Sequence, residues 1–188
     1  MIFRKYQQED LPQILRLFHD TVHSICSGDY TAAQLDAWAP DSFDTDVQKR
    51  WHCTLTEHFT VIAEEGLVIT GFGDIDDTGY LDRLYVHKDY QRQGIASGIC
   101  DRLEAHASPN IITTHASITA KPFFPEKRVS CGSQADYGTP RHSLTNFIMK
   151  RSRYSLLLFQ IPPFQYFTDP FCDQPYKIAA ATVPSLTP

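Results

Sequence analysis

The sequence of 188 residues lacks the features that mark membrane proteins, secreted proteins and general nucleic-acid binders. Its longest apolar stretch, LLLF near Leu156, is far shorter than the run of about 20 residues that crosses a bilayer. The N-terminus turns charged at Arg4, so we expect no signal peptide. The net charge is −5 and no local run of lysine and arginine offers a basic face. We therefore expect a cytoplasmic protein that has neither a membrane nor a nucleic acid as its partner.

Cysteine is sparse, and its spacing argues against two common frameworks. The five cysteines are an odd number and no two are spaced as CxxC, so neither a disulfide scaffold nor a zinc ribbon is indicated. His52, Cys53 and His58 also lack the spacing of metal ligands, and we predict no metal site. Buried or free thiols in a reducing cytoplasm are expected at Cys26, Cys53, Cys100, Cys131 and Cys172.

Apolar residues are abundant, and their distribution divides the chain in two. Hydrophobic residues make up 42% and aromatic residues 12%, enough for a single core. We assign residues 1–150 to one folded domain. Residues 151–188 are aromatic and proline-rich without a helical or strand period, and we predict an irregular tail of unknown role there.

Periodicity and capping signals predict an α/β fold. Helices are expected where apolar residues follow a 3.6-residue period after an N-cap: at Leu11–Ile25, at Thr31–Trp38, around Val47–Leu55, at Gly94–His106 and from Thr119 to Phe124. Asp10 is the expected N-cap of the first helix, and Thr31 with Gln34 forms a capping-box pattern at the start of the second. Strands are expected at Ile2–Tyr6, Phe59–Ala63, Leu67–Asp74, Tyr80–Val86, Ile111–Ala116 and Leu144–Lys150, with a hairpin turn at Glu65–Gly66. Alternation of strands and helices in the second half predicts a layered α/β structure with a mixed sheet.

The segment from Tyr80 to His106 is the most informative, because it runs strand, polar loop, glycine and helix. Gln91 to Ala96 matches the pattern Q/R-x-x-G-x-G/A. A helix N-terminus has unpaired N–H groups and partial positive charge, which attract a phosphate. Gly94 allows the backbone to approach a pyrophosphate, and the small Ala96 keeps the next turn open. The alternative is an ordinary helix entry that contains a glycine.

In this context the chain resembles the GNAT superfamily of N-acetyltransferases, in which that loop holds the CoA pyrophosphate. The stretch Ser117-x-x-Ala120-x-x-Phe123-Phe124 is similar to the family's N-x-x-A-x-x-F-Y signature. Asp29–Pro40 and Leu144–Met149 resemble segments of one bacterial subgroup. The resemblance implies an N-acetyltransferase domain at 1–150 with a mixed, mostly antiparallel sheet flanked by helices. It also implies transfer of an acetyl group from acetyl-CoA to an amine of a small molecule or peptide, without a metal, and it is compatible with a homodimer.

The resemblance also implies which residues hold acetyl-CoA. The backbone of Leu84, Tyr85 and Val86 would pair with the pantetheine arm as an added strand does. Backbone amides in the loop would cradle the pyrophosphate, and two residues after the next strand would complete the site: Gln91, Arg92, Gln93, Gly94, Ile95, Ala96 and Ser97 for the loop, then Ser117 and Phe123.

Two departures from the family pattern leave the acid and base open. Phe124 stands where the family has its tyrosine acid, and Tyr80 stands where the family has a glutamate base. Asp82 is the best remaining base, on the expectation that strand alternation places it on the face of Tyr80, Leu84 and Val86. A salt bridge with Arg83 or Arg4 is the alternative role of Asp82.

Other candidates for proton transfer are fewer. His115 ends the strand before Ser117, near the expected position of the amine, although a lone histidine is more often structural. Asp82, His115 and Tyr80 are therefore the candidate catalytic residues, with Asp74 and His23 as weaker ones. The acceptor surface is expected within His23–Pro40, whose acidic and aromatic residues would suit a cationic amine.

Two other functions stay open. One is a CoA-binding module of the same fold with weak or no catalysis, and the other is a nucleotide-binding regulator that uses the same glycine loop. Acetyl transfer by the purified protein separates the first from an enzyme. Competition between CoA and ATP for binding separates the second, which lacks a Walker-type motif.

The segment Arg128–Ser143 has no strand or helix period and prompts a different hypothesis. One permitted choice of codons, read one nucleotide later, gives a Gly-Phe pair, alternating strand residues and a turn before LTNFIM resumes at Leu144. We favour a shifted reading frame here, with the loss of a strand near the acceptor site. The alternative is a divergent surface loop. By the same reasoning, the tail after Arg151 would be read-through beyond a lost stop codon.

Overall fold

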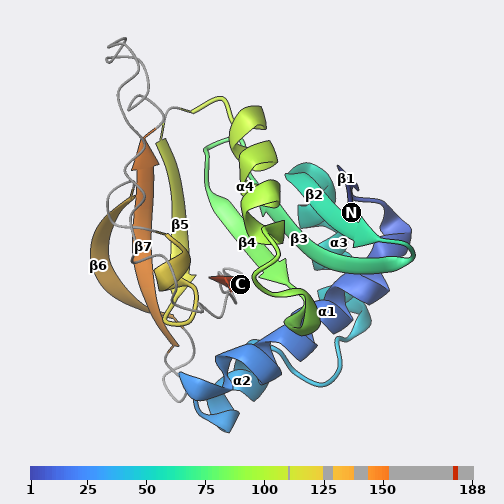
Figure 1. Ribbon diagram of the computed structural model, residues 1–188. Helices are drawn as coiled ribbons and strands as arrows, with labels where there is room; N and C mark the ends of the chain where they lie inside the picture. Colours follow the sequence, from blue (N-terminus) through green and yellow to red (C-terminus); the bar gives the residue numbers. More distant parts are fainter. Residues whose placement is uncertain (110, 125–128, 138–143, 153–179, 182–188) are drawn as a thin grey trace.

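The computed structural model describes residues 1–109, 111–124, 129–137, 144–152 and 180–181. Two sheets lie side by side, with helices on both faces of the larger sheet (Figure 1). The predicted α/β fold with a mixed, mostly antiparallel sheet is confirmed. Within these residues, no helix has the length and apolar character needed to traverse a bilayer.

The larger sheet is antiparallel, in the order β1-β2-β3-β4-β8. Its strands are β1 (Ile2–Lys5), β2 (Phe59–Glu65), β3 (Val68–Ile75), β4 (Leu81–Val86) and β8 (Ala180–Ala181). The smaller sheet, also antiparallel, has the order β5-β7-β6, from β5 (Ile111–Ser117), β7 (Leu144–Ser152) and β6 (Val129–Tyr137).

The α-helices within the described residues form at predicted places. They are α1 (Leu11–Ile25), α2 (Ala32–Trp38), α3 (Thr45–Glu57) and α4 (Ile95–His106). Thr31 and Gln34 form the predicted capping box at the start of α2. Asp10, predicted to cap α1, makes no cap bond to that helix and instead accepts two hydrogen bonds from Arg4, at 2.7 and 2.8 Å.

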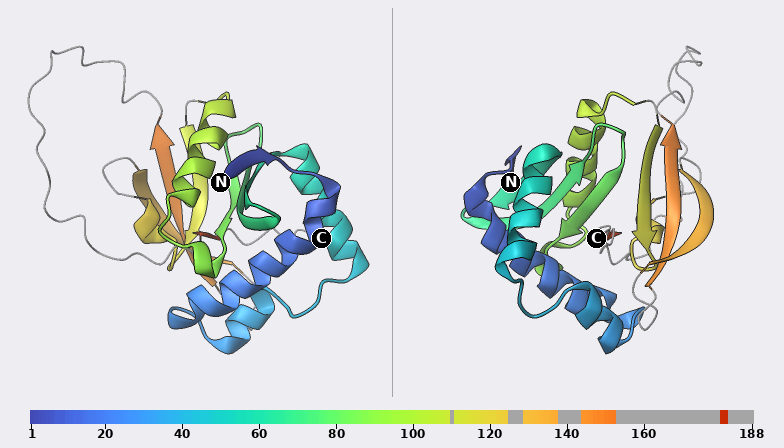
Figure 2. Two further views of the ribbon diagram at one scale, coloured as in Figure 1. Left: turned by 45° about the vertical axis from the view of Figure 1, so that its right-hand side comes forward. Right: turned by 180° about the vertical axis from the view of Figure 1, so that it is seen from behind.

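The larger sheet separates the core into two layers, and helices cover each layer (Figure 2). Helix α4 lies against one face, and α1, α2 and α3 cover the other. Glycines in β3 make the approach of α4 close. A Cβ at Gly71 would lie 2.9 Å from the Ile95 side chain, and one at Gly73 would lie 2.9 Å from Ile99. Since real Cβ atoms almost never come so near, the sheet needs glycine at both positions.

The two sheets meet at one point and then separate. Tyr80 and Thr113 form a single parallel bridge, and the Thr114 hydroxyl donates to the Leu81 carbonyl at 2.8 Å. Beyond this point β4 diverges from β5, and β8 pairs with β4 in the opening, at Arg83 and Leu84. The divergence leaves the rest of the β4 edge without a neighbour from the smaller sheet among the described residues.

Two expectations about the second half are wrong. The predicted helix from Thr119 is a single 3-10 turn, η4 (Lys121–Phe123), and Phe124 is extended. The Ser117 hydroxyl accepts from the Ala120 amide at 3.0 Å and tightens the turn.

The expected loss of a strand within Arg128–Ser143 is also wrong, because the backbone of Val129–Tyr137 forms β6 and pairs along β7. The remaining parts of that segment lie outside the described residues. The shifted frame itself stays a prediction, which resequencing the gene tests.

Candidate active site

The loop between β4 and α4 has the geometry that the sequence predicted. A 3-10 turn, η3 (Lys88–Tyr90), follows β4, and Gly94 is the N-cap of α4 with φ +76°. Arg92 also has a positive φ, of 61°. The Gln91 side chain donates to the Val86 carbonyl at 2.6 Å and holds the start of the loop against β4. The loop therefore enters α4 through two residues with left-handed backbone, Arg92 and Gly94.

A cavity of about 230 Å³, here called the loop cavity, lies on this segment. Its wall consists of Val86, Gln91, Arg92, Gly94, Ile95, Ala96, Ser97 and Phe123. These are eight of the predicted cofactor residues, brought together on one surface at a helix N-terminus. Backbone N–H groups at such a terminus bind anionic groups.

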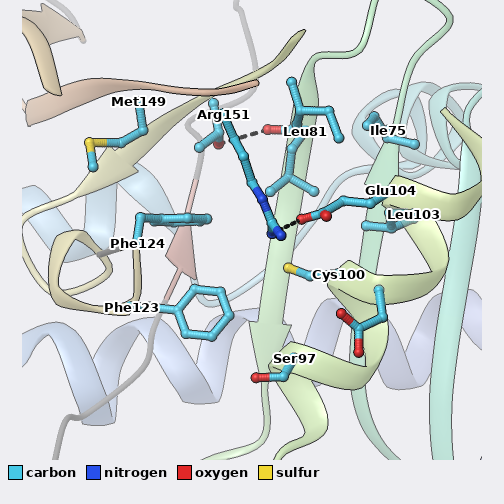
Figure 3. A pocket seen from close by; sticks show the side chains of 13 residues that line it. Ile75, Leu81, Ser97, Cys100, Leu103, Glu104, Phe123, Phe124, Met149 and Arg151 are labelled. Carbon is cyan, nitrogen blue, oxygen red and sulfur yellow. Dashed lines mark hydrogen bonds and ion pairs between the residues drawn. The ribbon is translucent and has the colours of Figure 1, made fainter. Parts of the chain in front are cut away.

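A second cavity of about 330 Å³, here called the α4 cavity, continues from the first, since Ser97 and Phe123 line both. Figure 3 shows α4 on one side of it and β5, β7 and the η4 turn on the other. Arg151 points into it and pairs with Glu104 of α4. Phe124, which stands where the family pattern has a tyrosine acid, forms part of the same wall.

Some predicted cofactor residues are placed away from both cavities. The Tyr85 side chain is 1% exposed and packs edge-on against Phe18 of α1, on the opposite face of β4. Ser117 is fully buried, and its hydroxyl accepts from the Ala120 amide. Gln93 is exposed and lines neither cavity. Tyr85 can contact the cofactor through its backbone but not through its side chain. The Ser117 side chain stabilises the turn that follows β5.

Strand β8 already pairs with part of the β4 edge that the sequence predicted would pair with pantetheine. Ala180 of β8 lies opposite Leu84, and Ala181 lies opposite Arg83. Since one strand edge pairs with one partner at a time, β8 and a pantetheine arm would exclude each other at Leu84.

A pocket of about 460 Å³, here called the aromatic pocket, opens on the other face of β4. Both tryptophans of the chain, Trp38 and Trp51, lie in its wall. Aromatic rings and charged groups both line it, and the full lining is Phe18, Ala37, Trp38, Pro40, Phe43, Val47, Arg50, Trp51, Thr54, His58, Asp76, Tyr80, Asp82 and Arg83. Apolar walls with a few charged groups are typical of a small-molecule site.

Asp82 lies in this pocket because of a β-bulge. Asp74 is opposite Arg83 while the next residue, Ile75, is opposite Leu81, so Asp82 is the extra residue of β4. The predicted shared face with Leu84 and Val86 is therefore wrong: those two side chains pack on the α4 side, whereas Asp82 lines the aromatic pocket. The bulge interrupts the alternation on which that prediction depended.

The Asp82 carboxylate is poised near neutral pH. Asp82 is 8% exposed, and its Oδ2 lies 3.2 Å from Arg83 Nη2. This ion pair is the alternative role that the sequence predicted for Asp82. Burial raises its pKa to about 6, against the opposing effect of the Arg83 charge. A carboxylate with this pKa in a cavity wall can act as a base at neutral pH.

The other two catalytic candidates differ in their access to the pocket. Tyr80 is in the wall, and its ring contacts the His115 ring edge-on at 5.4 Å between centroids. His115 itself lines none of the three cavities described above. Burial lowers the pKa of His115, so it is neutral at physiological pH. The structure brings Tyr80 and Asp82 together and places His115 behind Tyr80.

Sequence reasoning missed His58, which the fold brings to Asp82. His58 follows α3, and its Nδ1 lies 2.7 Å from Oδ2 of the fully buried Asp74. One atom each of His58, Asp74 and Asp82 lie within 4.8 Å of one another. Arg83 contacts both carboxylates, at 3.1 and 3.2 Å, and neutralises part of their charge. No local spacing signals this group, because its members come from three elements.

The predicted acceptor surface at His23–Pro40 is only partly in the pocket. Trp38 and Pro40 line it. Tyr30 instead bridges two elements: its hydroxyl donates to the Thr145 carbonyl and accepts from the Ile118 amide, both at 2.9 Å. Asp29 accepts a hydrogen bond from Thr119 at 2.5 Å. Tyr30 and Asp29 therefore make structural contacts within the fold. The other walls of the aromatic pocket come from α1, α3 and β4.

Comparison with known proteins agrees with this geometry. The model of the acetyltransferase (GNAT) domain matches residues 26–127. The uncharacterized N-acetyltransferase YafP of Escherichia coli strain K12 is 31% identical over 147 residues, which cover 78% of this chain and 93% of YafP. The chain therefore belongs to the GNAT family and is an N-acetyltransferase.

Solved structures share the fold. A GCN5-related N-acetyltransferase from Rhodopseudomonas palustris superposes with a TM-score of 0.74 at 27% identity, covering 80% of this chain and 94% of that one. The PaiA N-acetyltransferase of Thermoplasma acidophilum, in complex with coenzyme A, has a TM-score of 0.60 at 16% identity, covering 80% and 98%. YncA of Salmonella typhimurium, with acetyl-CoA, has a TM-score of 0.60 at 16% identity, covering 90% and 98%.

Proposed function

We propose that this enzyme transfers the acetyl group of acetyl-CoA to a primary amine with an apolar or aromatic body, and that the amine binds in the aromatic pocket. The observation that carries the proposal is the position of the β4 bulge. Leu81, just before the bulge, lines the α4 cavity, and Asp82, in the bulge, lines the aromatic pocket. Donor and acceptor would thus meet from opposite faces of one strand, where β4 and β5 separate.

The loop cavity supports acetyl-CoA as the donor. Its wall is the N-terminus of α4, which suits a pyrophosphate, and the α4 cavity continues from it toward the bulge. PaiA and YncA, which share the fold, were solved with coenzyme A and with acetyl-CoA. Most of the side chains in the wall of the α4 cavity are apolar, beside the Glu104–Arg151 ion pair, and they suit the neutral pantetheine arm.

The aromatic pocket supports a cationic amine as the acceptor. Rings of Trp38, Phe43 and Trp51 suit an apolar body, and an ammonium group is attracted by aromatic faces. Asp76 and Asp82 add negative charge to the same wall, which Arg50 and Arg83 offset in part. Asp82 would take one proton from the ammonium, and the free amine would attack the thioester carbonyl. The C–S bond then breaks, and the CoA thiolate takes the second amine proton by way of solvent, since Phe124 has none to give.

The test is thiol release from acetyl-CoA by the full-length protein with a panel of aromatic amines, aliphatic amines, peptides and aminoglycosides. We expect aromatic and other apolar amines to have the highest kcat/KM. Binding of acetyl-CoA without turnover of any amine would instead favour the alternative of a CoA-binding module, which Phe124 and the pairing of β8 with β4 keep open. Binding of neither would reject the proposal.

A further inference from the structure

His58 and Asp74 form a hydrogen-bonded pair at the edge of the aromatic pocket. Asp74 is fully buried in β3, and its Oδ2 accepts from His58 Nδ1 at 2.7 Å and from Arg83 Nη1 at 3.1 Å. A buried carboxylate of this kind fixes the ring orientation and the tautomer of the histidine, with the proton on Nδ1. Among the described residues, the other ring nitrogen, Nε2, has no hydrogen-bond partner. The imidazole is 20% exposed.

The pair lies next to the proposed base. One atom each from His58, Asp74 and Asp82 lie within 4.8 Å of one another, and His58 and Asp82 both line the aromatic pocket. Two hydrogen bonds of about 2.8 Å through one water span nearly this separation. One ring nitrogen of His58 therefore lies about one bridging water away from an Asp82 carboxylate oxygen.

We propose that His58, positioned by Asp74, is a second proton carrier that takes the proton from Asp82 and releases it to solvent. The inference rests on the proposed acetyl transfer with Asp82 as the base. Acetylation of an ammonium releases one net proton, which must leave a carboxylate that is only 8% exposed. The relay moves that proton from Asp82 through one water to the imidazole and then to bulk water, so that no other reactant is needed.

The charges around His58 favour transfer in this direction. Asp74 from β3 and Asp82 and Arg83 from β4 face the ring. On its other side, Lys5, Tyr6 and His52 share a separate small cavity with it. The hydrogen bond that His58 donates to Asp74 raises the pKa of His58 above its ordinary 6.5, and burial raises the pKa of Asp82 to about 6. The negative charges of Asp74 and Asp82 thus favour a protonated imidazole, which suits proton transfer from Asp82 to His58.

The experiment compares wild type, His58→Gln and His52→Gln in the full-length chain. His52 lies on α3, the helix that His58 follows, and contacts the Tyr6 hydroxyl at 2.9 Å, so its variant controls for the loss of a histidine nearby. We expect His58→Gln to lower kcat roughly 100-fold with an unchanged KM for acetyl-CoA. Rising concentrations of imidazole should restore part of the rate, because a small buffer can replace a proton carrier. His52→Gln should keep the wild-type kcat.

Two results would overturn the relay. The first is wild-type kcat in His58→Gln at every buffer concentration. The second is a loss of kcat that imidazole does not restore and that leaves the pH profile unchanged, which would indicate a structural role alone.

An NMR titration of the His58 imidazole separates failure of the relay from failure of the proposed function. Asp82→Asn should lower the pKa of His58, whether or not any amine is acetylated. An unchanged titration would reject the coupling, whereas a coupled titration in a protein that binds no acetyl-CoA would reject the function.

Discussion

The loop cavity and the aromatic pocket are assembled in different ways. The loop cavity draws all but one of its residues from Val86–Ser97, a single strand-loop-helix connection. The aromatic pocket combines residues of α1, α2, α3 and β4, and its central carboxylate occupies a β-bulge. A site formed by one segment depends on local backbone geometry. A site formed by three helices and a strand depends on how the whole domain packs.

The largest expected effect tests the local nature of the loop. Gly94→Val forces a β-branched residue into φ +76°, a conformation that it rarely adopts, and disturbs the amides at the start of α4. We expect acetyl-CoA binding to weaken at least roughly 100-fold, measured by calorimetry. Gly66→Val is the matched control, since Gly66 has φ +64° in the β2–β3 turn and also has open space around it. It should lose a similar amount of stability and no affinity.

The second comparison separates turnover from stability among the carboxylates. Asp82→Asn removes the proposed base, and we expect kcat to fall roughly 100-fold with the fold retained. In wild type, activity should fall as the pH drops through about 6, because the carboxylate with its raised pKa is then protonated. Asp74→Asn should lower kcat less.

Asp74→Asn should instead be the more destabilising change, by about 3 kcal/mol in the free energy of unfolding, because it breaks a buried ion pair. Since Asp74 raises the pKa of His58, their pair stabilises the fold below pH 6.5 and that contribution is lost as the pH rises through the raised pKa. Denaturant unfolding at several pH values measures both terms. Equal kcat in both variants and wild type would point to another group as the base.

The sequence predicts the loop cavity better than the aromatic pocket, because the first is formed by one segment and the second by several. The strand, the Gly94 loop and α4 follow from short-range signals, as does the α2 capping box at Thr31. The bulge at Asp82 has no such signal, because it depends on pairing with β3, and it reversed the face expected for that side chain. The His58–Asp74 contact joins residues that are 16 apart through the α3–β2 junction, which no spacing rule anticipates.

A smaller effect is expected in the wall of the aromatic pocket. Phe43 lies within 6.2 Å of the rings of Phe18 and Trp51, measured between centroids. Phe43→Leu should raise KM for an aromatic amine about threefold to tenfold, the range for one aromatic contact, with no change in KM for acetyl-CoA. Phe59→Leu, which removes a ring stacked on His106 outside the pocket, is the control. A change in the KM for acetyl-CoA alone would show that the aromatic pocket binds the acetyl donor and not the amine.

The smallest effect concerns the shared edge of β4. Neighbouring residues of an antiparallel strand point their N–H groups to opposite sides, so only one of Ala180 and Ala181 donates to β4. Proline at that position removes a ladder hydrogen bond, and proline at the other does not. One of Ala180→Pro and Ala181→Pro should therefore tighten acetyl-CoA binding about twofold to tenfold, and the other should change it less. Identical affinities in both variants and wild type would show that β8 does not compete with the cofactor.

One NMR experiment tests the central claim that donor and acceptor approach β4 from opposite faces. Both tryptophans line the aromatic pocket, so the two indole N–H signals report on that pocket, while the backbone amides of Gln91–Ser97 report on the loop. With ¹⁵N-labelled full-length protein, we predict that CoA shifts the Gln91–Ser97 amides and leaves the indoles nearly unchanged. An aromatic amine should shift the Trp38 and Trp51 indoles and not the loop. CoA signals confined to the indoles, or amine signals confined to the loop, would contradict the account.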